Sequence, residues 1–296
     1  MQQAVLITAY KNIRHLVEII DFLNNSNFIY FIHIDKKSII NDKDILFLSQ
    51  KENVRVIDRH YKINWGGINH LKAILRILKE AFRDNDIEYF HLITGHDFPI
   101  KSAGYITSFL ENNKGKEFME VNKLPYAKWP GNGGIERLTL YNLYDEVDGR
   151  NGLGRRIINN LNKVQKRLGI KRGFNEGFPP LYGGSTYWTL SRNAIGYVFD
   201  YMDNNPQYLK RFKYSFCSEE MFFQTLLCNS HFKENIVNNN LRYIIWEQRN
   251  GNFPANLDNS DFESIINSDA LFGRKFEYPV SEGLLLKLKS YLQDKQ

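Results

Sequence analysis

The chain has 296 residues, of which 43% are hydrophobic and 14% aromatic, so it can bury a substantial core and is not intrinsically disordered. Its formal net charge of +6 favours anionic partners such as nucleotide diphosphates, acidic glycans or a lipid surface. That charge is too modest and too evenly spread to indicate nucleic acid binding.

The sequence lacks the marks of export and of membrane insertion. No stretch approaches the roughly 18 uncharged apolar residues of a spanning helix, and no signal peptide precedes the first apolar run. Cys217 and Cys228 have a spacing that suits neither a zinc ribbon nor a disulfide framework, so we expect two buried thiols in a reducing compartment. We therefore expect a cytoplasmic protein, or one held peripherally on the inner face of the plasma membrane.

The first hundred residues alternate between short apolar runs and segments of helical periodicity. The runs predict buried strands at 4–10, 28–34, 54–57 and 89–94, and the periodic segments predict helices at 13–23 and 68–82. This order indicates a parallel sheet with right-handed crossovers, in which ligands bind beyond the carboxyl ends of the strands.

Those carboxyl ends carry the candidate residues of the N-terminal part. Asp35 follows the second strand and is as well placed to cap a helix as to accept from a ribose hydroxyl or a uracil N–H. Gly66-Gly67 after the third strand favours a tight start of a helix over a phosphate cradle. Asp97 after the fourth strand is a single carboxylate, where many sugar-nucleotide transferases hold a metal with an Asp-x-Asp pair.

Neither G-x-G-x-x-G after the first strand nor a P-loop occurs in the sequence, which argues against a nicotinamide enzyme and a P-loop NTPase.

The middle of the chain contains a basic amphipathic segment, 151–172. Such a helix either packs its apolar face on the core, which we favour, or lies on an anionic leaflet. Further on, Gly183-Gly184 precede a short strand, and Ser191 is placed to cap a helix over 193–202.

Two motifs near the C-terminus suggest chemistry. Ser218 has the pattern of the N-cap of an α-helix whose first turn holds Glu219 and Glu220, and the helix dipole alone would account for both acids. Such a position would also keep a carboxylate ionised, as a general base requires. Arg274-Lys275 lie between aromatic and apolar residues, which suggests fixed cations for an anionic leaving group.

Five motifs in order carry a family resemblance, and nearly the whole chain is covered. They are Trp65-Gly66-Gly67, Gly95-His96-Asp97-Phe98-Pro99-Ile100-Lys101-Ser102, Gly184-Ser185-Thr186-Tyr187-Trp188, Ser218-Glu219-Glu220-Met221-Phe222-Phe223-Gln224-Thr225 and Leu271-Phe272-Gly273-Arg274-Lys275-Phe276. The chain resembles the core-2/I-branching β-1,6-N-acetylglucosaminyltransferase and protein xylosyltransferase family.

The resemblance implies an α/β GT-A glycosyltransferase fold, with a Rossmann-like, mostly parallel central sheet flanked by helices. It implies one catalytic domain over 1–296, with a nucleotide-binding half at 1–102 and an acceptor-binding and catalytic half at 103–296. The implied reaction is inverting, metal-independent transfer from a UDP-sugar to a hydroxyl of a glycan or lipid-linked saccharide, without any cofactor. GlcNAc is favoured over xylose, and bacterial surface polysaccharide synthesis is the expected setting.

The resemblance also assigns roles to individual residues. Glu220 falls on the catalytic base, although Ser218-Glu219 stand where the family often has Pro-Asp. The residues implied to bind the UDP-sugar are Asp35, Trp65, Asp97, Arg249, Arg274 and Lys275, with Lys275 and Arg274 on the diphosphate. Those implied to bind the acceptor are Glu136, Arg137, Trp188 and Trp246.

Two other functions fit the same residues. One is a metal-dependent or retaining transferase on the same fold, which would use Asp97 as a metal ligand. The other is a non-catalytic glycan-binding module.

Overall fold

The computed structural model describes residues 1–293, and its centre is a seven-stranded sheet in the order β10-β6-β9-β4-β1-β2-β3. The four N-terminal strands are mutually parallel, as predicted: β1 (Gln2–Ala9), β2 (Phe28–Ile34), β3 (Val54–Asp58) and β4 (Ile87–Thr94). The strand β9 (Trp188–Ser191) runs antiparallel between β4 and β6 (Glu117–Met119), and β10 (Ile236–Val237) runs parallel to β6. Because β9 is antiparallel to both β4 and β6, β6 points the same way as β4, and so does β10, which is parallel to β6.

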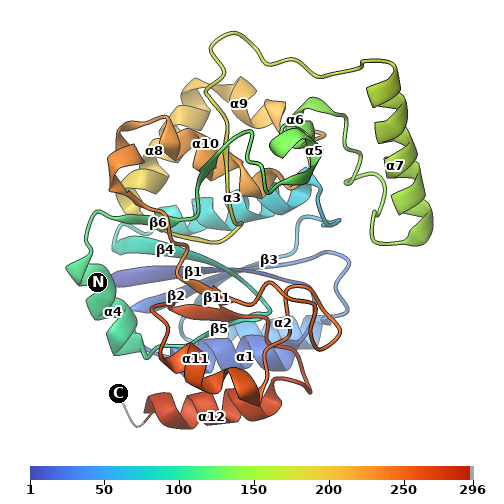
Figure 1. Cartoon of the computed structure of the whole chain (residues 1–296). Coiled ribbons are helices and arrows are strands. Elements are labelled where there is room, and N and C mark those ends of the chain that lie inside the picture. The colour runs from blue at the N-terminus through green and yellow to red at the C-terminus, as the bar shows by residue number, and fades with distance from the viewer. Residues whose placement is uncertain (294–296) are drawn as a thin grey trace.

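Helices cover both faces of this sheet (Figure 1). One face carries α1 (Ile13–Phe22), α2 (Asp42–Ser49), α4 (Ala103–Asn112), α11 (Phe262–Ile266) and α12 (Glu282–Gln293). The other carries α3 (Ile68–Phe82), α8 (Arg192–Asn204), α9 (Pro206–Arg211) and α10 (Phe222–Cys228). Alternate residues of β1 enter the two cores, Val5 and Ile7 one and Ala4 and Leu6 the other, which explains an apolar run without polar alternation. The mostly parallel α/β arrangement expected of a GT-A fold is confirmed.

A second, three-stranded sheet joins the C-terminal motif to the loop after β4. It consists of β11 (Arg242–Ile244), β12 (Phe272–Arg274) and β5 (Asp97–Pro99), with β12 antiparallel to β5. The register places Arg274 directly opposite Asp97. Two residues that are 177 positions apart in the sequence therefore become neighbours. A two-stranded sheet of β7 (Asn122–Lys123) and β8 (Tyr182–Gly183) lies nearby.

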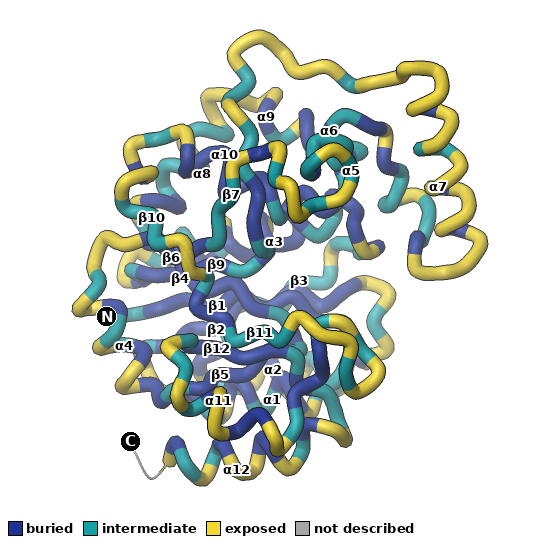
Figure 2. The backbone as a smooth tube through the Cα atoms, in the orientation of Figure 1, coloured by how far each residue is buried: buried dark blue, intermediate teal, exposed yellow. Residues whose placement is uncertain are grey.

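The basic segment forms α7 (Gly152–Arg167), which projects from the rest of the chain (Figures 1 and 2). The expectation that its apolar face packs on the core is wrong for most of the helix. Leu153 is 72% exposed and Leu168, just past its end, is 67% exposed, whereas Ile158 is buried. The shorter α5 (Pro130–Gly133) and α6 (Glu136–Thr139) connect β7 to this region.

The segment around Glu220 differs from the prediction of an α-helix capped by Ser218. A 3₁₀ turn, η1 (Ser218–Glu220), is separated from α10 by Met221, whose φ of −133° breaks the helix. The Ser218 hydroxyl donates to the Phe212 carbonyl at 3.4 Å instead of capping a helix. Cys217 and Cys228 are free and buried as expected, but they do not share a helix.

Ser191 caps α8 as predicted, since its hydroxyl accepts from the amide of Ala194 at 3.2 Å. The 3₁₀ turns η2 (His231–Asn235) and η3 (Asn259–Asp261) complete the elements. Within residues 1–293, no helix has the length and apolar character needed to cross a membrane.

Candidate active site

Glu220 lies in a recess that changes the acidity of its carboxyl group. Arg137 of α6 forms an ion pair with it through Nη1 and Oε2, and the Arg137 guanidinium lies 3.7 Å from the centroid of the Trp129 ring. The Glu220 side chain keeps 26% of its surface exposed. Burial raises the pKa of Glu220 to about 7, assisted by Glu219 and opposed by Arg137. The carboxylate is therefore accessible and poised to take up a proton near neutral pH.

The neighbouring backbone fixes the position of Glu220. The Cys217 amide donates to the Gly66 carbonyl at 2.9 Å, and the Gly184 amide donates to the Glu220 carbonyl at 2.8 Å. Gly66 has φ +86°, and a Cβ there would lie 2.5 Å from the Phe216 ring. The Trp65 motif and the Gly183-Gly184 motif thus hold the same short segment from two sides.

Gly67 marks the tight start of α3, as predicted. The Asp145 carboxylate accepts from the amides of Ile68 and Asn69 at 3.0 and 3.1 Å, and so caps α3 from a distant part of the chain. A Cβ on Gly67 would overlap that carboxylate.

Asp97 and Arg274 form a buried ion pair. Arg274 Nη1 donates to Asp97 Oδ1 at 3.0 Å, while the Thr94 amide donates to Asp97 Oδ2. The side chain of Asp97 is fully buried and that of Arg274 is 8% exposed. The two charges neutralise each other. The geometry therefore does not favour the predicted contact of Arg274 with a diphosphate, or that of Asp97 with the donor. The ion pair instead fixes the backbone from which Lys275 extends.

Lys275 is the half-buried cation of this motif. Burial lowers the pKa of Lys275 to about 8, assisted by the neighbouring Arg274 and Arg150 and opposed by Asp97 and Glu277. Arg150 belongs to the loop before α7, and we did not select it from the sequence. Cations that crowd one another in this way favour the binding of an anion.

One segment links the carboxylate and the cation. The Gly184 amide binds the Glu220 backbone, and the ring of Tyr187, three residues later, lies 4.2 Å from the Arg274 guanidinium. The Gly184–Tyr187 stretch therefore extends from the Glu220 backbone to Arg274, which precedes Lys275. These motifs are far apart along the sequence, and the fold brings them together in one site at the carboxyl edge of the sheet.

Asp35 and Trp65 lie in the loops after β2 and β3. Asp35 is 7% exposed, and its Oδ1 accepts from the amides of Lys37 and Ile63 at 2.9 and 3.2 Å. It braces this loop, and it does not cap α2, which begins at Asp42. Trp65 packs edge-on against Phe216 at 5.1 Å and Tyr144 at 6.1 Å, and it remains 50% exposed, so part of the indole is accessible to a ligand.

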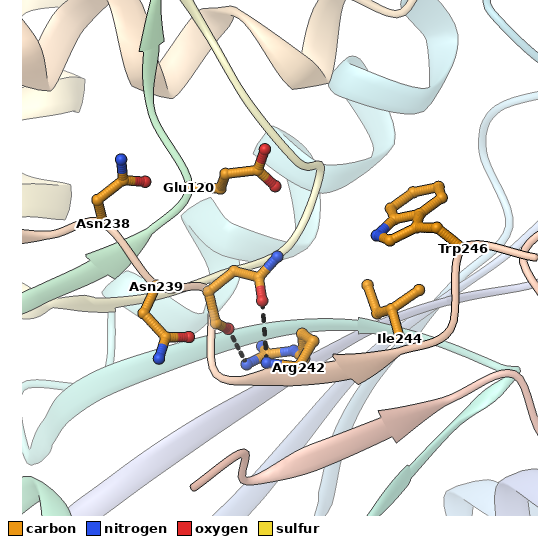
Figure 3. A pocket seen from close by; sticks show the side chains of 7 residues that line it. Glu120, Asn238, Asn239, Arg242, Ile244 and Trp246 are labelled. Carbon is orange, nitrogen blue, oxygen red and sulfur yellow. Dashed lines mark hydrogen bonds between the residues drawn. The ribbon is translucent and has the colours of Figure 1, made fainter. Parts of the chain in front are cut away.

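A polar cavity of about 290 Å³ is lined by Glu120 and Trp246, among other residues (Figure 3). Its lining includes Glu120, whose charge raises the pKa of Glu220, and Trp246, which is 60% exposed. The other lining residues are Asn238, Asn239, Asn240, Arg242 and Ile244. Amide groups, a carboxylate and an aromatic ring are suited to the hydroxyls and apolar faces of a sugar.

Sequence reasoning missed Glu120 and the three asparagines, although a signal existed. Glu120 directly follows β6 and Asn238 directly follows β10. Both strands point the same way as β4, so both residues lie at the carboxyl edge, where ligands bind. The strands themselves are only three and two residues long, too short for periodicity to reveal.

His70 of α3 is a further polar residue that the sequence did not single out. It lies 3.0 Å from Glu219 Oε1 and 3.1 Å from the Thr8 hydroxyl at the end of β1. Glu219 is thereby anchored next to Glu220.

Three predicted site residues are placed elsewhere. Trp188 is fully buried and packs on Phe223 at 4.9 Å, so it cannot touch an acceptor, which corrects that assignment. Glu136 pairs with Lys166 of α7 at 2.5 Å, while its neighbour Arg137 alone reaches Glu220. Arg249 pairs with Asp261 at 2.6 Å, so its charge is already matched.

Comparison with known proteins assigns this arrangement to a class. The sequence model of the Core-2/I-Branching enzyme family matches residues 4–266. The chain therefore belongs to the Core-2/I-branching enzyme family, a family of glycosyltransferases.

Curated relatives agree with that assignment. Xylosyltransferase 1 of Mus musculus is 26% identical over 97% of this chain and 30% of its own length. Xylosyltransferase 2 of Rattus norvegicus is 25% identical over 97% of this chain and 33% of its own length. The chain thus spans about a third of the length of these relatives.

Solved structures are more distant. S. aureus TarS 1–349 in complex with UDP has a TM-score of 0.32 and 15% identity, covering 40% of this chain and 35% of its own. Core-mannan synthase A from Aspergillus fumigatus, in an Mn/GDP form, has a TM-score of 0.39 and 10% identity, covering 80% of this chain and 72% of its own.

Proposed function

We propose that the protein transfers a sugar from a UDP-sugar to a hydroxyl of a glycan or lipid-linked saccharide, with inversion and without a metal. The observation that supports the proposal is Glu220, a partly exposed carboxyl group whose pKa is about 7 and is raised in part by Glu120, a lining residue of the polar cavity. The Gly184–Tyr187 stretch connects the Glu220 backbone to Arg274, which precedes the fixed cation Lys275.

The proposed reaction is a single displacement. Glu220 accepts the proton from the acceptor hydroxyl as that oxygen forms a bond to the anomeric carbon. The bond from the anomeric carbon to the UDP oxygen breaks on the opposite face, so the configuration inverts. The electron pair of that bond leaves on the diphosphate, where Lys275 stabilises the developing negative charge.

Metal independence rests on the state of Asp97. The Asp97 side chain is fully buried, and its charge is already matched by Arg274, so it offers no accessible, unpaired carboxylate to a metal ion. Positive side chains then take the part that a divalent cation plays in other transferases. Trp65 is proposed to contact the donor, and Trp246 and Glu120 the acceptor.

The donor and acceptor are proposed by class. GlcNAc remains the favoured sugar and xylose the second, and the xylosyltransferase relatives add weight to xylose. The acceptor is proposed to be a saccharide destined for a bacterial surface polysaccharide.

Release of UDP in excess EDTA tests the proposal. UDP-GlcNAc and UDP-xylose are each offered with a panel of saccharide and polyprenyl-diphosphate-linked acceptors, and the anomer of the product is read by NMR. We expect transfer in EDTA and a product of opposite anomeric configuration. Transfer that needs manganese, or a retained anomer, would contradict the mechanism, and glycan binding without UDP affinity would favour a binding module.

We also propose that α7 rests on an anionic membrane surface. Leu153, Ile157 and Val164 are 72%, 46% and 50% exposed along one side of the helix, and the neighbouring side chains of Arg155, Arg156, Lys163 and Arg167 are exposed cations. Apolar residues flanked by cations match the boundary between acyl chains and anionic headgroups.

Sedimentation with vesicles tests this membrane proposal. We expect binding to phosphatidylglycerol vesicles and weak binding to phosphatidylcholine vesicles, with loss of binding in the L153S/V164S double variant. The L286S variant is the control, because Leu286 is 63% exposed on a different helix, α12. Equal sedimentation of all variants would refute the role of α7.

A further inference from the structure

A second cavity of about 290 Å³ lies where the basic segment meets α9. The residues that line it include three cations, Arg172, Lys210 and Arg211. Neutral hydrogen-bonding groups complete the lining, on Tyr141, Asn175 and Gln207. None of these residues lines the cavity beside Glu120.

Arg211, which lines this cavity, has hydrogen-bond donors that are not satisfied by the described residues. It is only 9% exposed, and its Nε and Nη1 atoms are buried without a hydrogen-bond acceptor among residues 1–293. Its Nη2 donates to the Arg172 carbonyl at 3.3 Å, and its guanidinium lies 4.3 Å from the Phe174 ring. Buried donors without acceptors are costly, so an acceptor from outside the chain would stabilise the Arg211 guanidinium.

Arg172 places a second guanidinium next to the first. It donates to the carbonyls of Leu138 and Arg211 at 3.2 and 2.7 Å, and its own amide donates to the Thr139 carbonyl at 2.8 Å. Burial, followed by the neighbouring Arg172, lowers the pKa of Arg211 to about 10.

No carboxylate within residues 1–293 forms an ion pair with Arg172, Lys210 or Arg211. Most buried arginines in proteins are matched by an acid. Here two guanidinium groups and an ammonium line one cavity, and no acid within residues 1–293 pairs with them. An anionic ligand would supply the missing charge.

We infer that this cavity binds a phosphate group, through the unpaired guanidinium edge of Arg211 together with Arg172 and Lys210. Arginine presents a planar fork of donors that fits phosphate oxygens, and the amide and phenol groups at the rim add neutral donors. The source is either free phosphate or the head group of a phosphorylated lipid. The cavity also adjoins α6, since Arg172 holds the Leu138 carbonyl next to Arg137.

Calorimetric titration of the full chain with orthophosphate, and then with pyrophosphate, tests this inference. We expect saturable binding that weakens at least tenfold in R211Q and in Q207E. Gln207 is exposed, so Q207E adds a repelling charge at the rim without removing an internal contact. The matched control is R55Q, which removes one exposed cation from β3 and should leave binding unchanged. Each titration is repeated in K275Q, which removes the cation of the proposed donor site. Phosphate bound at that site then does not contribute to the result, whether or not the proposed function is correct.

Vesicles that contain polyprenyl phosphate distinguish the two sources. If the lipid supplies the phosphate, Q207E weakens vesicle binding and orthophosphate competes with it; if free phosphate is the ligand, only the titrations respond. The inference is wrong if orthophosphate and pyrophosphate do not bind with saturation. It is equally wrong if R211Q and Q207E, verified as folded by circular dichroism, bind orthophosphate and pyrophosphate as tightly as R55Q does.

Discussion

Arg137 holds the carboxylate of Glu220 through an ion pair, yet the pKa of Glu220 remains near 7 because burial outweighs the attraction of the guanidinium. The guanidinium is itself fixed over the Trp129 ring. A carboxylate held in this way is oriented for proton transfer and basic enough to perform it.

Replacement of Glu220 by glutamine tests this role. We expect E220Q to lower turnover by roughly 10²- to 10⁴-fold, the usual contribution of general base catalysis, while UDP binding is retained. Turnover is measured by UDP release and binding by calorimetry. E234Q, at an exposed glutamate of η2, is the control and should behave as wild type. Near-normal turnover of E220Q would remove Glu220 from the mechanism.

The pH dependence of kcat/KM should be a narrow bell. Glu220 must lose its proton to act as a base, so activity rises with pH through about 7. Lys275 must keep its proton to hold the diphosphate, so activity falls as pH rises through about 8. The profile of kcat/KM reports the groups of the free enzyme.

The R137Q variant separates these two limbs. Arg137 lowers the pKa of Glu220, so its loss should move the acidic limb upward and leave the basic limb in place. At a pH well below the midpoint, a tenfold weaker acid at Glu220 leaves about a tenth of the ionised, active fraction. An unmoved acidic limb would show that it belongs to another group.

Breaking the buried pair of Asp97 and Arg274 should destabilise the fold. D97N leaves a buried guanidinium without its counter-charge, which costs about 3–5 kcal/mol of the free energy of unfolding. Urea denaturation measures this loss. The exposed variant D42N is the control, since the Asp42 side chain is 99% exposed. A small loss in D97N would mean that the pair does not hold β5 to β12.

Alanine at Gly66 should disturb the Glu220 segment. The added Cβ meets the Phe216 ring in a backbone conformation with φ +86°, so we expect a loss of about 1–3 kcal/mol and reduced turnover. G104A is the control, because a Cβ at Gly104 of α4 meets no atom within 4 Å. Thermal unfolding and UDP release measure the two effects, and wild-type behaviour of G66A would refute the steric argument.

Local patterns indicated most of the N-terminal half of the fold, although α2, between β2 and β3, was not predicted. The strands β1, β2 and β4 are long apolar runs, β3 is a shorter stretch interrupted by Arg55, and α3 has a clear stripe, so composition and period indicate them. The pattern failed at Ser218, because backbone contacts from Gly66 and Gly184 impose a 3₁₀ turn where the residues themselves favour an α-helix.

The sequence by itself determined the alternation of strands and helices, the family motifs, and the candidate base and fixed cations, since these depend on residues close together in the chain. Only the tertiary structure decided which charges are free. Arg274 is neutralised by Asp97, Arg249 by Asp261, and Trp188 is enclosed by the core, whereas Lys275 retains its charge and Glu120 lines the polar cavity. The reason is physical, because burial and pairing are set by partners that lie up to 177 positions away along the chain.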